Sequence, residues 1–204
     1  MKTIHKRLAA LLLALLMLVA FCGCSSPTKQ AEATVSGMFD AFKALDFEKA
    51  QNYINVEDMK LSEVKEDETT DYEMFMKALF DRLDYTIISS EEVDSETVNV
   101  VVEITAVDMK VVLADYMVAA LQYAFSNAFA DPQPTEEEIN KKMEELFVAS
   151  ATKENLATVT NEVTVKVENK DGKWKVISED ALVDAMFGGL IAATESLSDS
   201  FNEQ

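Results

Sequence analysis

Two segments of this chain alternate apolar and polar side chains with a period of two, which is the pattern of β-strands with one buried face. In Thr97–Val107 the apolar side chains recur at every second position. The same alternation runs through residues 157–168, where the repeating side chain is mostly valine. We therefore expect an antiparallel sheet at the centre of the fold, buried on its valine-bearing face.

Short turns join each of these strands to a neighbour. Residues 85–93 have the composition of a strand and precede the first alternating segment across a polar turn, so the two are expected to form a hairpin. After the second segment, Asp171 and Gly172 provide the positive dihedral angles that a tight hairpin turn needs. The return strand, residues 173–177, carries the sole tryptophan, Trp174, which we expect to anchor the packed face of the sheet.

Apolar side chains at helical spacing predict helices before the sheet. Residues 31–45 are expected to form a first helix, in which Gly37 indicates close packing, and Asp46 is expected to cap a short second helix. A capping box at residues 70–73 opens a third helix. Its apolar side chains form the widest aromatic stripe in the chain: Tyr72, Phe75, Met76, Leu79, Phe80 and Leu83. We expect this stripe to be core, and the alternative is the wall of a ligand cavity.

Two further helices are predicted between the alternating strands, as an inserted helical hairpin. Asp108 is expected to cap a helix over residues 109–130, and a capping box from Thr135 to Glu138 starts another over residues 136–153. The first of these helices contains few charges, so much of its surface has to be covered. Burial within the domain is the expectation, and an exposed interaction face is the alternative.

A last helix follows the sheet, capped by Ser178. Gly188 and Gly189 lie inside it and indicate either close helix contact or the end of its first half. Together these elements predict an α+β fold in a single domain over residues 31–197, followed by a polar tail at residues 198–204.

The first 23 residues have the features of a lipoprotein signal peptide. Lys2, Lys6 and Arg7 form a basic region, and residues 8–21 are an unbroken apolar run of 14, too short for the roughly 20 residues that span a membrane. A small residue, Gly23, precedes Cys24, as lipid modification of that cysteine requires. An uncleaved anchor and a plain secretory signal remain the alternatives.

If the chain is cleaved before Cys24, its diacylglycerol supplies the two acyl chains that give stable membrane anchoring. Residues 24–30 are polar and are expected to form a short tether, so the domain lies close to the outer face of the cell membrane.

Removing the signal leaves 15 basic and 37 acidic side chains, a net charge of about −22, and takes away His5 and Cys22. The remaining 181 residues contain no histidine and no cysteine other than Cys24. This composition excludes catalytic triads and zinc sites built on His or Cys, and the acidity argues against nucleic acid binding. The length is too small for a two-lobed solute-binding protein. We expect no cofactor.

Residues 44–50, which read Ala-Leu-Asp-Phe-Glu-Lys-Ala, and residues 169–176, which read Asn-Lys-Asp-Gly-Lys-Trp-Lys-Val, resemble the small surface lipoproteins of Gram-positive bacteria with a cystatin-like cone. These proteins belong to the nuclear-transport-factor-two-like superfamily. The resemblance implies a curved antiparallel sheet wrapped on helices, with room for a cavity, and it implies no activity. The inserted helical hairpin and the C-terminal helix depart from that fold.

Two classes of function fit these features. The first is a non-catalytic, lipid-anchored module that binds a small apolar ligand or a protein partner at the cell surface. Its candidate surface consists of Phe75, Leu79, Tyr116, Phe125 and Phe129. A structural surface protein without a ligand is the plainest version of this class.

The second class is a cavity enzyme that uses carboxylate and tyrosine acid–base chemistry, as steroid-isomerase-like members of the superfamily do. Glu103 would be the base, with Tyr116 or Tyr53 as the donor, although a strand carboxylate such as Glu103 is expected to be solvated. The acidic segment at residues 57–73 lacks the ligand spacing of a calcium loop, so we expect no defined metal site.

Overall fold

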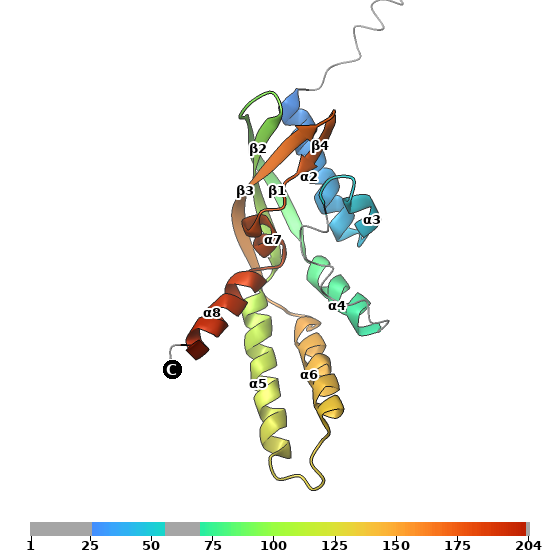
Figure 1. Ribbon diagram of the computed structural model, residues 1–204, viewed down its shortest axis with the longest axis vertical. Coiled ribbons are helices and arrows are strands. Elements are labelled where there is room, and N and C mark those ends of the chain that lie inside the picture. Colours follow the sequence, from blue (N-terminus) through green and yellow to red (C-terminus); the bar gives the residue numbers. More distant parts are fainter. Residues whose placement is uncertain (1–25, 56–69, 203–204) are drawn as a thin grey trace, which may run out of the picture.

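The computed structural model describes residues 26–55 and 70–202, which form an α+β structure around an open, four-stranded antiparallel sheet (Figure 1). The strands are β1 (Asp84–Glu92), β2 (Thr97–Val107), β3 (Thr158–Lys170) and β4 (Lys173–Val176). They lie in the sheet in sequence order, and each is antiparallel to its neighbours. The fold class predicted from the sequence is confirmed.

One face of the sheet is buried and the other is open to solvent. On the buried face, Val98 of β2 lies opposite Val167 of β3, and all the alternate apolar residues of β2 are at most 1% exposed. On the open face, Glu103 lies opposite Glu162. The period-two alternation therefore predicted the buried face correctly, and Trp174 is also part of the buried core, as expected.

In the described residues before β1 the helices are α2 (Pro27–Lys43), α3 (Phe47–Ala50) and α4 (Thr70–Phe80). Helix α2 begins at Pro27, so residues 27–30, which were expected to belong to the tether, form its first turn. Ser26 caps this turn by accepting a hydrogen bond from the Lys29 N–H, and Pro27 has no N–H to satisfy there. Asp46 caps α3 as predicted.

Helix α2 packs on the buried face of the sheet, where Val35, Met38 and Phe39 are fully buried. Gly37 is in close contact with the ring of Tyr53, because a Cβ built on this glycine would lie 2.4 Å from the ring. This confirms the close packing that the glycine indicated.

An aromatic cluster joins α2, α3 and α4 to the C-terminal helices. The ring of Phe80 lies 5.4 Å from that of Phe42, 6.2 Å from Phe47 and 5.6 Å from Phe187, measured between centroids. The stripe of α4 is therefore core, as expected, at the four positions that the structure describes in detail: Met76, Leu79, Phe80 and Leu83. Its other two side chains, Tyr72 and Phe75, lie outside the described part.

Between β2 and β3 the chain forms α5 (Met109–Asn127) and α6 (Glu136–Ala151), which project away from the sheet (Figure 1). We call these two helices, with residues 128–135 between them, the helical arm. Asp108 caps α5, and Thr135 and Glu138 form the predicted capping box of α6. The Asp108 N–H also donates to the Ala157 oxygen at 2.8 Å, so the arm leaves and rejoins the sheet at paired residues.

The predicted C-terminal helix is two helices, α7 (Asp180–Met186) and α8 (Leu190–Asn202). Ser178 does not cap α7, which corrects the sequence prediction: Glu179 is the N-cap residue, and the buried Ser178 hydroxyl makes no hydrogen bond. Helix α8 includes residues 198–202, which were expected to be a polar tail.

The two helices separate at Gly188 and Gly189, both of which have positive φ angles. A Cβ on Gly188 would lie 1.6 Å from the Val107 carbonyl oxygen, and the Met109 N–H donates to the Gly188 oxygen at 3.0 Å. The glycine pair therefore ends the first half of the predicted helix, and the close contact at Gly188 is with the end of strand β2 and not with a helix.

Gly188→Ala is expected to destabilise the fold more than Gly189→Ala does. In Gly189→Ala the new Cβ meets no other atom, because open space surrounds its position. The substitution is therefore disfavoured only by the positive φ angle, which costs about 1–2 kcal/mol. Gly188→Ala must also displace the end of β2, adding about 2 kcal/mol. Urea denaturation of both variants measures the difference. Equal free energies of unfolding would contradict the contact with Val107.

Candidate functional site

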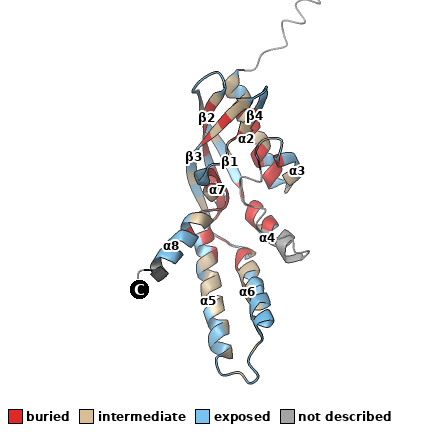
Figure 2. Ribbon diagram, in the orientation of Figure 1, coloured by how far each residue is buried: buried red, intermediate tan, exposed pale blue. Residues whose placement is uncertain are grey.

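The helical arm lies largely outside the hydrophobic core. In Figure 2, buried residues gather where the helices meet the sheet, whereas the arm is mostly half-buried or exposed. Buried side chains in α5 are confined to Met109 and Val112, and those in α6 to Ser150 and Ala151, all at the base of the arm. The arm therefore contributes little to the core, and most of its side chains are available at the surface.

A groove of about 570 Å³ runs along the arm between α5 and α6. We call it the arm groove. Among the residues that the structure describes, its lining contains no Asp, Glu, Lys or Arg: Tyr116, Met117, Ala120, Leu121, Tyr123, Ala124, Asn127, Ala128, Gln133, Pro134, Ile139 and Met143. A groove of this kind suits an apolar group, with the tyrosine hydroxyls and two amides available for hydrogen bonds.

Contacts near the base of the arm hold its two helices together. The rings of Tyr116 and Phe147 meet edge to face with their centroids 5.5 Å apart. Closer to the sheet, the Lys153 ammonium lies 2.7 Å from the Asp115 carboxylate. Beyond these contacts Ala120 and Ala124 of α5 and its C-cap residue Ala128 line the groove, and their small side chains leave the space between the helices unfilled.

The outer side of α5 is also apolar and is exposed. Val118 is 56% exposed, Leu121 55% and Phe125 76%, and Phe129, just beyond the end of the helix, is 97% exposed. We call these four residues the apolar stripe. Leu121 also lines the arm groove, so the stripe and the groove adjoin.

The structure divides the candidate surface predicted from the sequence. Tyr116 lines the arm groove, and Phe125 and Phe129 belong to the exposed stripe. Leu79 is only 3% exposed and belongs to the core, because α4 turns it inward. The side chain of Phe75 lies outside the described residues, and so does Cys24.

Several groove residues were not singled out from the sequence, notably Ala120, Ala124, Ile139 and Met143. The recurrence of alanine at every fourth position of α5 was the available signal. It is a weak one, because alanine is also the residue that best favours a helix.

The residues considered for catalysis lie in different parts of the fold. Glu103 is exposed on the open face of the sheet, Tyr116 is in the arm, and Tyr53 packs on Gly37. Among the described residues five carboxyl groups have a shifted pKa, and in each case it is lowered: Asp84, Asp94, Glu138, Glu145 and Glu168. A general base held near neutral pH would need the opposite shift.

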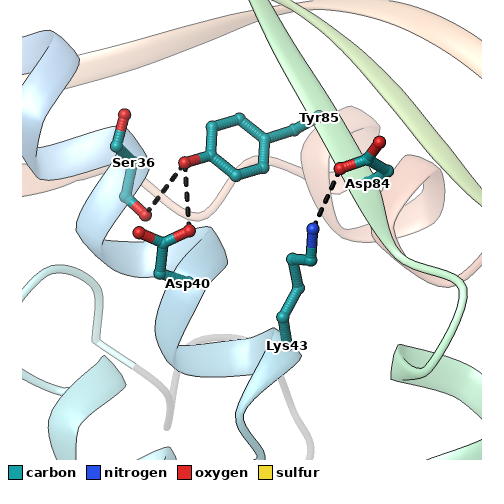
Figure 3. Close-up of polar contacts among 5 residues, drawn as sticks. All are labelled: Ser36, Asp40, Lys43, Asp84 and Tyr85. Carbon is teal, nitrogen blue, oxygen red and sulfur yellow. Dashed lines mark hydrogen bonds and ion pairs between the residues drawn. The ribbon is translucent and has the colours of Figure 1, made fainter.

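Hydrogen bonds and an ion pair join a cluster of polar side chains between α2 and β1 (Figure 3). The Tyr85 hydroxyl donates to the Asp40 carboxylate at 3.1 Å, and burial raises the pKa of Tyr85. The Lys43 ammonium lies 2.9 Å from the Asp84 carboxylate. The Tyr85 ring stacks on Phe39, with 4.7 Å between centroids. These contacts hold α2 against the edge strand β1.

The fold and the groove thus define an α+β domain that presents an apolar surface on a projecting helical arm. Within the described ranges no three Asp, Glu, His or Cys side chains come together as metal ligands do. The helices of residues 26–55 and 70–202 also include none with the length and apolar character of a membrane span.

The sequence matches no protein-family description, and no curated protein is significantly similar to it. Among solved structures the chain is similar to a crystal structure of YcdA from Bacillus subtilis subsp. subtilis strain 168, provisionally described as a lipoprotein. The TM-score is 0.44 and the sequence identity 16%, over 72% of this chain and 44% of YcdA. This chain therefore spans less than half of YcdA.

The provisional description of YcdA as a lipoprotein is consistent with the lipoprotein signal that residues 1–24 of this chain predict. A TM-score this low does not place the two proteins in one family, and we draw no functional conclusion from it. The cystatin-like cone and the nuclear-transport-factor-two-like superfamily stay predictions.

Lys43→Met is expected to raise the pKa of Asp84 toward its ordinary value of 3.8, because the hydrogen bond from Lys43 is the main cause of its lowering. The ion pair stabilises the fold at pH values above 3.8, and this contribution is lost as the pH falls through the lowered pKa. An NMR titration of the Asp84 carboxyl carbon measures the change. Lys77→Met, which removes the partner of Asp81, is the control and should leave Asp84 unaffected. An unchanged Asp84 pKa in Lys43→Met would show that the Tyr85 N–H alone holds it low.

Proposed function

We propose that this protein is a lipid-anchored, extracytoplasmic binding module whose arm groove takes up an apolar group of a small ligand or of a protein partner. The observation that supports it is the groove itself, an uncharged hollow on a chain with a net charge of −19. Because the core is packed without these residues, the apolar lining is not needed to fold the sheet. An apolar surface retained outside the core is typical of a binding site.

The anchor follows from the N-terminal sequence. A basic region, an apolar run of 14 residues and Gly23 before Cys24 are the features that lipoprotein export requires. The acidic surface would be repelled by anionic lipid, so attachment depends on the acyl chains.

Binding is favoured over catalysis by the chemistry of the lining. Its polar groups are two tyrosine hydroxyls and two amides, and the described lining contains no carboxylate, histidine or lysine that could act as a general base. Such groups orient a bound molecule by hydrogen bonds. Glu103, the base considered from the sequence, lies on the exposed face of β2 and not in the groove.

Cys24→Ala is expected to abolish incorporation of labelled palmitate into the protein and to remove its mature form from the membrane fraction. Cys22→Ala is the matched control and should change neither, because Phe21 before Cys22 is too bulky for the position that precedes a modified cysteine. Labelling that persists in Cys24→Ala would contradict the assigned anchor.

Ala124→Phe is expected to weaken binding of the neutral apolar dye phenylnaphthylamine by about fivefold or more, because the added ring takes up the space that the dye needs. Dye fluorescence in a titration of residues 26–204 measures it. Ala181→Phe adds the same ring to an exposed alanine of α7 and should bind the dye as the unmodified protein does. If the dye does not bind, or if Ala124→Phe binds it as well as Ala181→Phe does, the groove is not the apolar site.

A further inference from the structure

The apolar stripe is left uncovered by any ligand that fills only the arm groove. Phe125 and Phe129 do not line the groove, yet they are the two most exposed large apolar side chains of the described residues, at 76% and 97%. An occupant that accounts for the whole surface has to cover the stripe and fill the adjoining groove.

We propose that the occupant is a second copy of this chain, bound arm to arm. Each arm carries a ridge, the apolar stripe, beside a hollow, the arm groove. A two-fold axis between two arms sets the ridge of each copy in the groove of the other, the self-complementary arrangement of symmetric dimers. The four helices then pack as a bundle around aromatic and alanine side chains. This inference rests on the proposed function, because it names the partner of the same groove.

Charge favours this surface for contact between copies. Two chains of net charge −19 repel one another over most of their surfaces. From Tyr116 to Ala130 the chain has no Asp, Glu, Lys or Arg, and Asp115 and Asp131 stand at either end of this stretch. The stretch from Tyr116 to Ala130 therefore adds no charge repulsion where two copies approach, and a basic partner would find no carboxylate in the groove.

The area available is consistent with a stable pair. An aromatic side chain buries about 150–250 Å² when it is covered, so Phe125 and Phe129 supply roughly 300 Å² of the ~800 Å² per partner in a standard interface. Val118 and the lining of the groove, which includes Leu121, add to this area. A small ligand would leave both phenylalanines in water.

The geometry also allows both copies to be anchored in one membrane. The start of α2 and the connection between α5 and α6 lie at opposite ends of the molecule (Figure 1). A two-fold axis parallel to the arm keeps both N-terminal ends on the same side. Confinement to one surface raises the effective concentration of the arms, so even a modest affinity is sufficient.

The test is photo-cross-linking of the full chain on cells. Benzoylphenylalanine replaces Leu121, at the border of stripe and groove, and two copies with different tags are expressed together. Ile88 is the matched control position, because it is 52% exposed where Leu121 is 55%, and it lies on β1. We expect a product that carries both tags from position 121, in at least about tenfold excess over position 88, because only position 121 lies in a specific interface.

A second pair of variants tests the ridge. In the position-121 background, Phe125→Ser with Phe129→Ser should lower the two-tag product by about tenfold, as loss of central aromatic anchors does. Ile88→Ser with Val93→Ser removes two apolar side chains that are 52% and 57% exposed and should leave the product unchanged. Circular dichroism of both pairs checks that folding is intact.

Ionic strength gives an independent outcome. For the lipid-anchored protein in phosphatidylcholine vesicles, the two-tag product should increase as sodium chloride rises from about 0.05 to 0.3 M, because salt screens repulsion between acidic copies. A decrease with salt would show contact through opposite charges and would overturn the proposal.

A product of position 121 with another protein or with lipid, or the absence of a two-tag product, also overturns it. The proposed function is judged separately, by dye binding and its loss in Ala124→Phe. If the groove binds the dye but no two-tag product forms, the proposed function is retained and the proposed dimer is refuted.

Discussion

The structure depends on a close contact at the end of β2, where the Val107 carbonyl meets the backbone of Gly188. This contact joins three parts of the chain that are far apart in sequence. The Met109 N–H, at the start of the arm, donates to the Gly188 oxygen, and the Asp108 N–H donates to the Ala157 oxygen at the start of β3. A side chain at position 188 would occupy the position of the Val107 oxygen. The orientation of the arm and the turn into α8 are thus fixed together.

The hydrophobic core and the apolar surface of the arm lie in different parts of this molecule. Burial against the sheet stabilises the fold through large side chains such as Phe39, Phe42 and Phe80, each at most 1% exposed. The arm contributes few buried residues beyond its base. Substitutions in its outer half are therefore expected to change the free energy of unfolding little, since surface changes rarely exceed about 0.5 kcal/mol.

The sequence predicted the strands, the caps at Asp46 and Asp108, and the capping box at Thr135 because these depend on local patterns of side chains. It did not predict the groove, because α5 is apolar on every side and its periodicity selects no face for α6. The break between α7 and α8 was left open, since a glycine pair is compatible with a continuous helix. Leu79 was placed on a candidate surface because the spacing of an apolar stripe does not show what covers it.

Because both ends of the arm are paired with each other at the sheet, the length of the arm is independent of the strand register. Thr158 lies opposite Val107, so the two strands pair directly where residues 109–156 leave and rejoin the sheet. Adding or removing a helical turn would change the reach of the arm by about 5.4 Å without shifting the register of any strand. The length of the arm can therefore change while the residues of the core keep the same packing.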